Sequence, residues 1–143
     1  YGIAIRPGKP TTIAIVNDKP VFSLPGHPTS ALLIVHLLVR SVLTKMAGRK
    51  LEPPVTVNAQ VSERLFPSRG RRTYVTLMLK RDKAGKIGAS PVPTGLSGAI
   101  TTLAKADGFT VIHESQQFIE KDQTVEVELL KPAVYHCLTK RER

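Results

Sequence analysis

The sequence predicts two parts: an α/β remnant of strands plus one long helix, followed by a small, mostly antiparallel, barrel-like β domain. Three observations predict this division. Short apolar runs lead into a nearly continuous apolar stretch of helical length. A polar, proline-stiffened segment follows, of the kind that links two lobes. Beyond it, apolar and polar residues alternate with a period of two, which is typical of a strand with one buried face.

The first part is expected to span residues 1–50. Its apolar runs predict short buried strands at residues 2–5 and 12–16, and a third strand at 21–24. Pro28 suits the first position of a helix, where no backbone donor is needed, and Gly48 suits the position after its end. The first turns of this helix are apolar on nearly every face, so it needs cover on more than one side. We expect that cover to come from the remainder of a longer α/β domain, of which this chain would be a piece.

A linker at residues 51–54, a β domain at 55–131 and a basic tail of little structure at 132–143 are expected to follow. The strands of the β domain are predicted, in chain order, at residues 55–62, 73–79, 87–92, 109–112 and 124–129. One short helix, at residues 97–105, is predicted to interrupt them. In the last strand, Val125 and Val127 occupy the inward positions.

The composition limits the functional classes. Lys and Arg number 21 against 11 Asp and Glu, so the formal net charge is +10 and anionic partners are favoured. Cys137 is the single cysteine, which excludes an internal disulfide and fits a reducing cytoplasm. The histidines lack the spacing of metal ligands, so no metal site is predicted in this chain. The longest apolar run is shorter than the ~18 to 20 residues that cross a bilayer, so no membrane partner is expected.

Two turns in the first part are candidates for binding an anion. Arg6 and Lys9 flank Gly8, and a glycine there would let an oxyanion approach the backbone closely. The later strand-to-helix connection presents backbone N–H groups and the Ser30 hydroxyl, while His27 is a candidate helix cap. From pattern alone, a turn with two solvated cations and an ordinary strand-to-helix connection are the favoured interpretations.

Eight basic residues and one acid lie between Arg64 and Lys86. Within this cluster Arg71 follows a glycine at a strand start, where its guanidinium could bind two oxygens of phosphate or molybdate; Arg72 is the alternative. Ser97 is predicted to cap the short helix and is also a potential oxyanion donor. A solvated hairpin is the plain alternative for the cluster, and nucleic-acid binding is weaker because aromatic platforms are few.

Four sequence elements, in order, resemble the molybdopterin molybdotransferase family that contains MoeA and the gephyrin E domain. IRPGKP at residues 5–10 and LPGHPTSA at 24–31 resemble the family elements KPGKP and LPGNPVSA. GRRTY at 70–74 resembles GRxEF, and LSG through LAKADG at 96–108 resembles GSG…LAxADG. TVEV at 124–127 falls where the family has its closing strand. Together these elements cover nearly the whole chain.

The resemblance implies a MoeA/MogA-like fold for the first part and a cytoplasmic enzyme of molybdenum cofactor synthesis. Such an enzyme inserts molybdate or tungstate into adenylyl-molybdopterin and releases AMP. The resemblance also implies an elongated homodimer and Mg²⁺, whose ligands would lie upstream of Tyr1. By motif, Arg6 and Lys9 would hold anionic groups and Ser30 would line the cleft. The β domain of the other subunit would face that cleft with Arg71, alternatively Arg72, and with Ser97.

The sequence departs from the family pattern in two ways. Arg6 stands where lysine is common, which keeps the charge, and His27 stands where asparagine is usual. The acidic metal ligands and the glycine-rich loop of the family have no counterpart here, so the chain alone is expected to be inactive. Two other classes stay open: a basic β module that binds nucleic acid or another polyanion, and a structural domain that caps a dimer.

Overall fold

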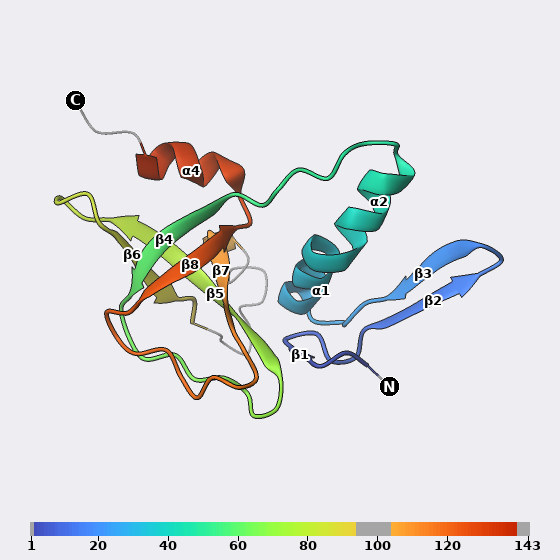
Figure 1. Cartoon of the computed structure of the whole chain (residues 1–143), viewed down its shortest axis with the longest axis horizontal. Coiled ribbons are helices and arrows are strands. Elements are labelled where there is room, and N and C mark those ends of the chain that lie inside the picture. The colour runs from blue at the N-terminus through green and yellow to red at the C-terminus, as the bar shows by residue number, and fades with distance from the viewer. Residues whose placement is uncertain (1, 94–103, 140–143) are drawn as a thin grey trace.

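A closed β barrel forms the C-terminal part of the computed structural model, which describes residues 2–93 and 104–139 (Figure 1). Its strands are β4 (Thr56–Val61), β5 (Arg72–Arg81), β6 (Ile87–Pro91), β7 (Gly108–Ile112) and β8 (Thr124–Leu129). They follow the order β5-β6-β4-β8-β7, and β7 pairs with β5 to close the ring. Only β4 and β6 are parallel among these neighbours. The predicted barrel-like, mostly antiparallel domain is therefore confirmed.

The barrel interior is filled by the alternating apolar residues that the sequence predicts. In β4 the exposed fraction is 1% at Ala59 and 0% at Val61, and in β8 it is 0% at Val127. Leu77 of β5 and Ala89 of β6 are also fully buried. Each large buried side chain of this kind contributes about 1.5 to 3 kcal/mol relative to an exposed one. Strand alternation thus specifies which face of each strand forms the core.

The N-terminal strands do not form the α/β layer that the sequence predicts, so this part of the prediction is not confirmed. β1 (Ile5–Arg6) pairs in parallel with β5 at the edge of the barrel. β2 (Thr12–Val16) and β3 (Lys19–Ser23) form a separate antiparallel hairpin that projects from the rest of the chain (Figure 1). The predicted burial of the second strand is wrong: Ile13 is 50% exposed and Ile15 78%, because β2 pairs with β3 alone in the described part of the chain.

A continuous helical segment runs from Pro28 to Met46, as predicted. It comprises α1 (Pro28–Ile34), a π-helical turn η1 (Val35–Val39) and α2 (Arg40–Met46). One side is buried, with Ile34 0% exposed, whereas Leu43 on α2 is 57% exposed. The π turn has no signature in the sequence, and π turns are frequent near functional positions.

By length and composition, this segment of 19 residues with a mean hydropathy of 1.4 would be sufficient to cross a membrane. That finding is weak evidence, because the core helix of a soluble protein meets the same criteria. The expectation that the chain has no membrane partner stays a prediction.

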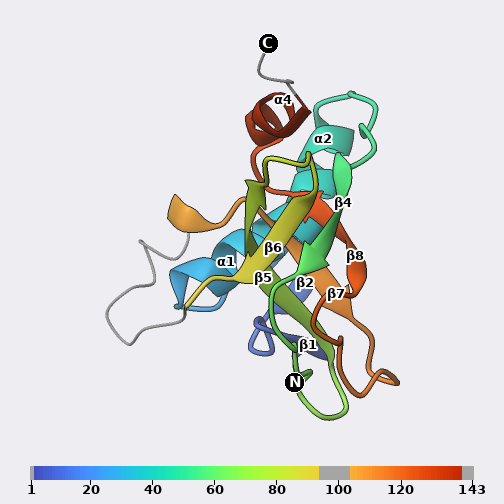
Figure 2. The same cartoon turned by 90° about the vertical axis from the view of Figure 1, so that its left-hand side faces the viewer.

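The helical segment and the C-terminal helix both contact the barrel. Nε2 of His36, in η1, lies 2.7 Å from Oε1 of Glu128 in β8, and the His36 ring packs edge-on against Phe109. α4 (Pro132–Thr139) lies across one end of the barrel (Figure 2). Its carbonyl at Leu138 accepts a hydrogen bond from Nη1 of Arg81 at 2.9 Å, and Leu138 is 7% exposed. The expectation of a tail with little structure is therefore wrong over these residues, because an apolar side chain anchors them to the barrel.

Candidate functional site

A cavity of about 730 Å³ lies where the N-terminal part meets the barrel. Its walls come from the end of β1, the start of α1, the loop that follows β4, and strands β5 and β6. The volume is within the range of small-molecule sites, which is about 300 to 1,000 Å³. The resemblance placed such a cleft between two subunits; here a single chain brings both regions together.

Arg6 supplies the permanent positive charge of this cavity. The pairing of β1 with β5 fixes its backbone, since Arg6 lies opposite Thr73 and the Arg72 N–H donates to the Ala4 carbonyl at 3.2 Å. Nη1 of Arg6 donates to Oγ of Ser68 at 2.6 Å, which holds the guanidinium at the cavity wall. A guanidinium has five N–H donors, so this bond leaves others for an anionic ligand.

Six residues with hydroxyl groups share the cavity wall with Arg6: Thr29, Ser30, Ser68, Thr73, Tyr74 and Thr76. No Asp or Glu lines the cavity among the described residues. Hydroxyl groups can donate to an anion without adding negative charge. The wall is therefore suited to an oxyanion.

Thr73 also holds the cavity wall in shape. Its Oγ1 accepts a hydrogen bond from the Ser68 N–H at 2.9 Å and donates to the Arg71 carbonyl at 3.2 Å. These bonds fix the loop that carries Ser68 toward Arg6. Thr73 is 7% exposed, so its role is to order the loop more than to meet a ligand.

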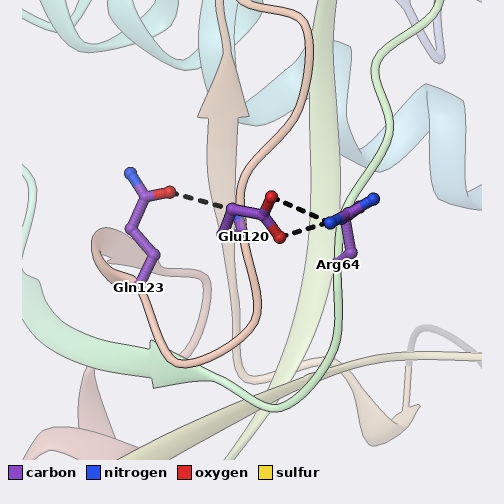
Figure 3. A network of polar contacts seen from close by, with 3 residues as sticks. All are labelled: Arg64, Glu120 and Gln123. Atoms are coloured by element: carbon purple, nitrogen blue, oxygen red, sulfur yellow. Dashed lines mark hydrogen bonds and ion pairs between the residues drawn. The ribbon is translucent and has the colours of Figure 1, made fainter.

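A second polar network fixes the same loop from its other end (Figure 3). Nε and Nη2 of Arg64 each donate to the Glu120 carboxylate at 2.8 Å, and the Glu120 N–H donates to Oε1 of Gln123 at 3.0 Å. The Arg64 guanidinium also lies 5.0 Å from the centre of the Phe118 ring. Arg64 was grouped with the basic cluster on sequence, but its charge is paired with Glu120, and both residues lie in loops between strands.

His27 lines the cavity immediately before α1. Its backbone carbonyl accepts the Ala31 N–H at 3.0 Å, but its side chain makes no capping hydrogen bond. His27 therefore occupies the N-cap position, as predicted, and accepts the first helical hydrogen bond through its backbone carbonyl, without a capping bond from its side chain. His27 and Arg6 thus both belong to the lining of this cavity.

The predicted anion turn around Gly8 packs against α1. Gly8 has a φ of +127°, and a Cβ there would lie 2.8 Å from Cδ1 of Ile34. The positive φ therefore favours glycine in this turn, which packs closely against Ile34 of α1, and binding of an anion by the turn stays a prediction. Lys9 is exposed and does not line the cavity.

Arg71 and its alternative Arg72 do not line the cavity. Arg71 is half-buried and lies outside its lining, although its N–H donates to the Ser68 carbonyl at 3.2 Å. Arg72, the alternative, is exposed on a different face, with Nε 3.9 Å from a Glu114 carboxylate oxygen. Ser97 lies outside the described residues. Of the five predicted site residues, the structure therefore brings Arg6 and Ser30 together.

Sequence reasoning missed the hydroxyl residues on β5 and the one in the loop between β4 and β5. Alternation along β5 predicts that Thr73 faces inward, but it does not predict which cavity that face borders. Metal ligands are also absent as a set: the described residues contain no group of three or more His, Cys, Asp or Glu arranged to hold a metal ion. The described residues therefore provide no such set of ligands for Mg²⁺.

Fold and cavity together define a class: a small mixed β barrel joined to a long helix, with a cavity lined by one arginine and several hydroxyl groups at their junction. Residues 58–130 match the family model of the MoeA C-terminal region (domain IV). The chain belongs to the MoeA family.

Proteins that align with nearly the whole chain agree with this assignment. A protein of Methanocaldococcus jannaschii named for molybdopterin biosynthesis is 32% identical over 92% of the chain and 29% of its own length. The molybdopterin molybdenumtransferase of Bacillus subtilis is 28% identical over 90% of the chain and 30% of its own length. The crystal structure of a molybdopterin biosynthesis MoeA protein from Pyrococcus horikoshii is 39% identical, with a TM-score of 0.77, and covers 92% of the chain. The chain spans about 30% of the length of these relatives.

Proposed function

We propose that this chain is the part of a molybdopterin molybdotransferase that holds the anionic groups of the substrates. The complete enzyme would insert molybdate or tungstate into adenylyl-molybdopterin and release AMP. The observation that carries the proposal is the cavity with Arg6, six hydroxyl residues and no carboxylate among the described residues of its lining. The names of the relatives support the same reaction class.

The apolar part of the cavity suits the rest of such a substrate. Phe66, at the cavity rim, is 68% exposed, and Tyr74 lies on the wall. Aromatic side chains pack favourably against flat heteroaromatic rings. A ligand that combines a ring system with phosphate or molybdate oxygens would therefore use both kinds of wall.

In this proposal the residues of the chain bind and orient the substrate. Arg6 holds an oxyanion through charge-assisted hydrogen bonds, and Ser30 with its neighbouring hydroxyl groups fixes the orientation. Donors fixed before the reaction stabilise developing negative charge without reorganising. Bound Mg²⁺ would offset phosphate charge in the complete enzyme, with ligands outside this part of the chain.

Three residues expected from the family resemblance, Lys9, Arg71 and Ser97, remain part of the proposal. The Arg71 N–H donates to the carbonyl of Ser68, a residue of the cavity lining, so Arg71 stays the proposed anion-binding residue of the barrel. Lys9 and Ser97 would act with elements that complete the site. A cytoplasmic homodimer would supply those elements.

The experiment is a titration of the chain with molybdate at fixed ionic strength. Arg6→Ala is expected to weaken binding roughly ten- to hundredfold, because it removes a charge-assisted contact worth about 1.5 to 3 kcal/mol. Arg6→Lys is expected to recover part of the affinity, since a point charge lacks the two-pronged geometry. Arg71→Ala in the same assay decides whether that guanidinium reaches the anion.

Lys80→Ala is the matched control. Lys80 is exposed on β5 and does not line the cavity, so its loss should change affinity by about 1 kcal/mol or less. Equal losses in Arg6→Ala and Lys80→Ala would show that the cations act only through the general charge of the chain. The cavity would then not be the binding site.

A further inference from the structure

Phe66 is an exposed aromatic residue in the lining of the cavity. It lies in the loop between β4 and β5, and it is 68% exposed. Within the described residues its ring has no aromatic or cationic partner, whereas Phe118, in the loop after β7, lies 5.0 Å from the Arg64 guanidinium. The Phe66 ring therefore adds little to the barrel core and is accessible to a ligand.

Hydrogen bonds hold the backbone on both sides of Phe66. Before it, Leu65 exchanges two backbone hydrogen bonds with Ile119, at 2.9 and 3.0 Å. After it, the Ser68 N–H donates to Oγ1 of Thr73 at 2.9 Å. The residue between these anchors that follows Phe66 is a proline, which confines Phe66 to extended backbone. Phe66 is thus held at a fixed place, so little backbone entropy is lost when a ligand packs on it.

The contact between the two loops also decides which side chains share a face. Leu65 and Ile119 belong to the buried core, and their antiparallel pairing sets Phe66 opposite Phe118 on the outer side. Phe118 is 37% exposed but does not line the cavity. Phe118 is therefore a matched control for Phe66: an exposed phenylalanine of the same pair of loops, outside the cavity lining.

Phe66 also lies close to the proposed position of the oxyanion. Ser68, two residues further along the loop, accepts the hydrogen bond from Nη1 of Arg6 at 2.6 Å. Two residues of chain span at most about 7 Å, so the Cα atoms of Phe66 and Ser68 lie within that distance. One small molecule with a short link between its charged and aromatic parts can therefore contact both Arg6 and Phe66.

We propose that Phe66 selects ligands with a flat nitrogen heterocycle, by stacking on the ring while Arg6 holds the phosphate or molybdate oxygens. The inference rests on the proposed function and deepens it, because it assigns recognition of the ring to one residue. Stacking of a base on an aromatic side chain changes affinity on the order of tenfold, and it tolerates different rings because each has a π face. The purine and the pterin of the proposed substrate share this chemistry.

The test is a titration of the complete 143-residue chain with three phosphate monoesters at fixed ionic strength. AMP carries a purine, neopterin monophosphate carries a pterin, and ribose 5-phosphate carries neither ring. We expect at least one ring-bearing ligand to bind the parent chain roughly tenfold more tightly than ribose 5-phosphate. The ring that shows this preference identifies the half of the substrate that Phe66 contacts.

Three variants assign the preference to its residue. Phe66→Leu is expected to abolish the preference and to leave the affinity for ribose 5-phosphate unchanged, because leucine is apolar but has no π face. Phe66→Tyr should keep the preference. Phe118→Leu, the matched control, should bind all three ligands as the parent does. Circular dichroism and thermal unfolding establish that each variant is folded.

Equal affinity of the parent for all three ligands, or a ring preference that survives in Phe66→Leu, would overturn the proposal. An equal loss of all three ligands in Phe66→Leu would also overturn it, since Phe66 would then only shape the loop. Phosphate binding that depends on Arg6 but shows no ring preference would reject the role of Phe66 and leave the proposed site intact. Absence of binding of every ligand, with the parent chain folded, would reject both.

Discussion

Gly108 begins β7 at a point where the backbone of β8 comes very close. A Cβ there would lie 2.4 Å from the Glu128 carbonyl oxygen and 2.8 Å from Cγ1 of Val127. Backbone atoms cannot move aside as a flexible side chain can, so Gly108→Ala is expected to lower the free energy of unfolding by about 2 to 4 kcal/mol. Chemical denaturation of the two proteins measures the difference.

Gly88→Ala provides the comparison within the same barrel. Gly88 lies in β6, and a Cβ there would meet the Lys80 carbonyl at 3.7 Å, an ordinary contact. A change within about 0.5 kcal/mol is expected for this variant. If both substitutions had equal effects, the close approach of β7 and β8 would not be the reason for the glycine.

Residues of the candidate site could be predicted from the sequence only where they belong to a short contiguous motif. Arg6 and Ser30 were found because each belongs to a contiguous turn with a recognisable composition. Thr73 and Ser68 could not be found in this way, because their place in the cavity depends on the pairing of β1 with β5. His27 was assigned to the helix start from its position before Pro28, and the structure has it at the N-cap of α1.

At the scale of elements, the contact between η1 and β8 joins the helical segment to the barrel. The side chains of His36 and Glu128 are only 14% and 26% exposed, so their 2.7 Å contact is largely removed from water. We expect a double-mutant cycle with His36→Ala and Glu128→Ala to give a coupling of about 1 to 2 kcal/mol. Thermal or chemical unfolding of the four proteins provides the measurement.

Arg64 and Glu120 form the control pair for that cycle. Their side chains are each 49% exposed, and exposed ion pairs contribute about 0.2 to 1 kcal/mol even with good geometry. A coupling for this pair as large as that between His36 and Glu128 would contradict the inference that burial strengthens the contact between helix and barrel.

Strands and helices were predicted correctly where the apolar residues repeat with a clear period. Predictions failed where strand pairing or burial depends on which other strands lie alongside. Clean alternation identified β4 and β8, and a long apolar run with a proline start identified the helix. The closure of the barrel through β5 and β7 could not be derived, since strand patterns do not specify neighbours. The exposure of β2 was missed for the same reason: an apolar strand is buried only if another layer covers it.

At the scale of the whole molecule, part of the net charge of +10 is taken up by contacts among the described residues. Arg64 is paired with Glu120, Arg72 lies near Glu114, and Arg81 donates to the carbonyl of Leu138. The basic cluster between β4 and β6 is therefore partly used within the fold. The family assignment gives no support to the alternative of a nucleic-acid-binding module.

The size of the chain leads to the last prediction. Because it spans about 30% of the length of its relatives, it carries the cavity but only part of the proposed catalytic machinery. We expect the isolated chain to bind molybdate saturably and yet to form no cofactor from adenylyl-molybdopterin, molybdate and Mg²⁺. Binding alone does not accelerate a reaction, since acceleration requires contacts that are stronger in the transition state than in the ground state. The assay measures released AMP, with the full-length Bacillus subtilis relative as the positive control. Release of AMP by the isolated chain above the level of Arg6→Ala would contradict the prediction and would place the catalytic groups within these 143 residues.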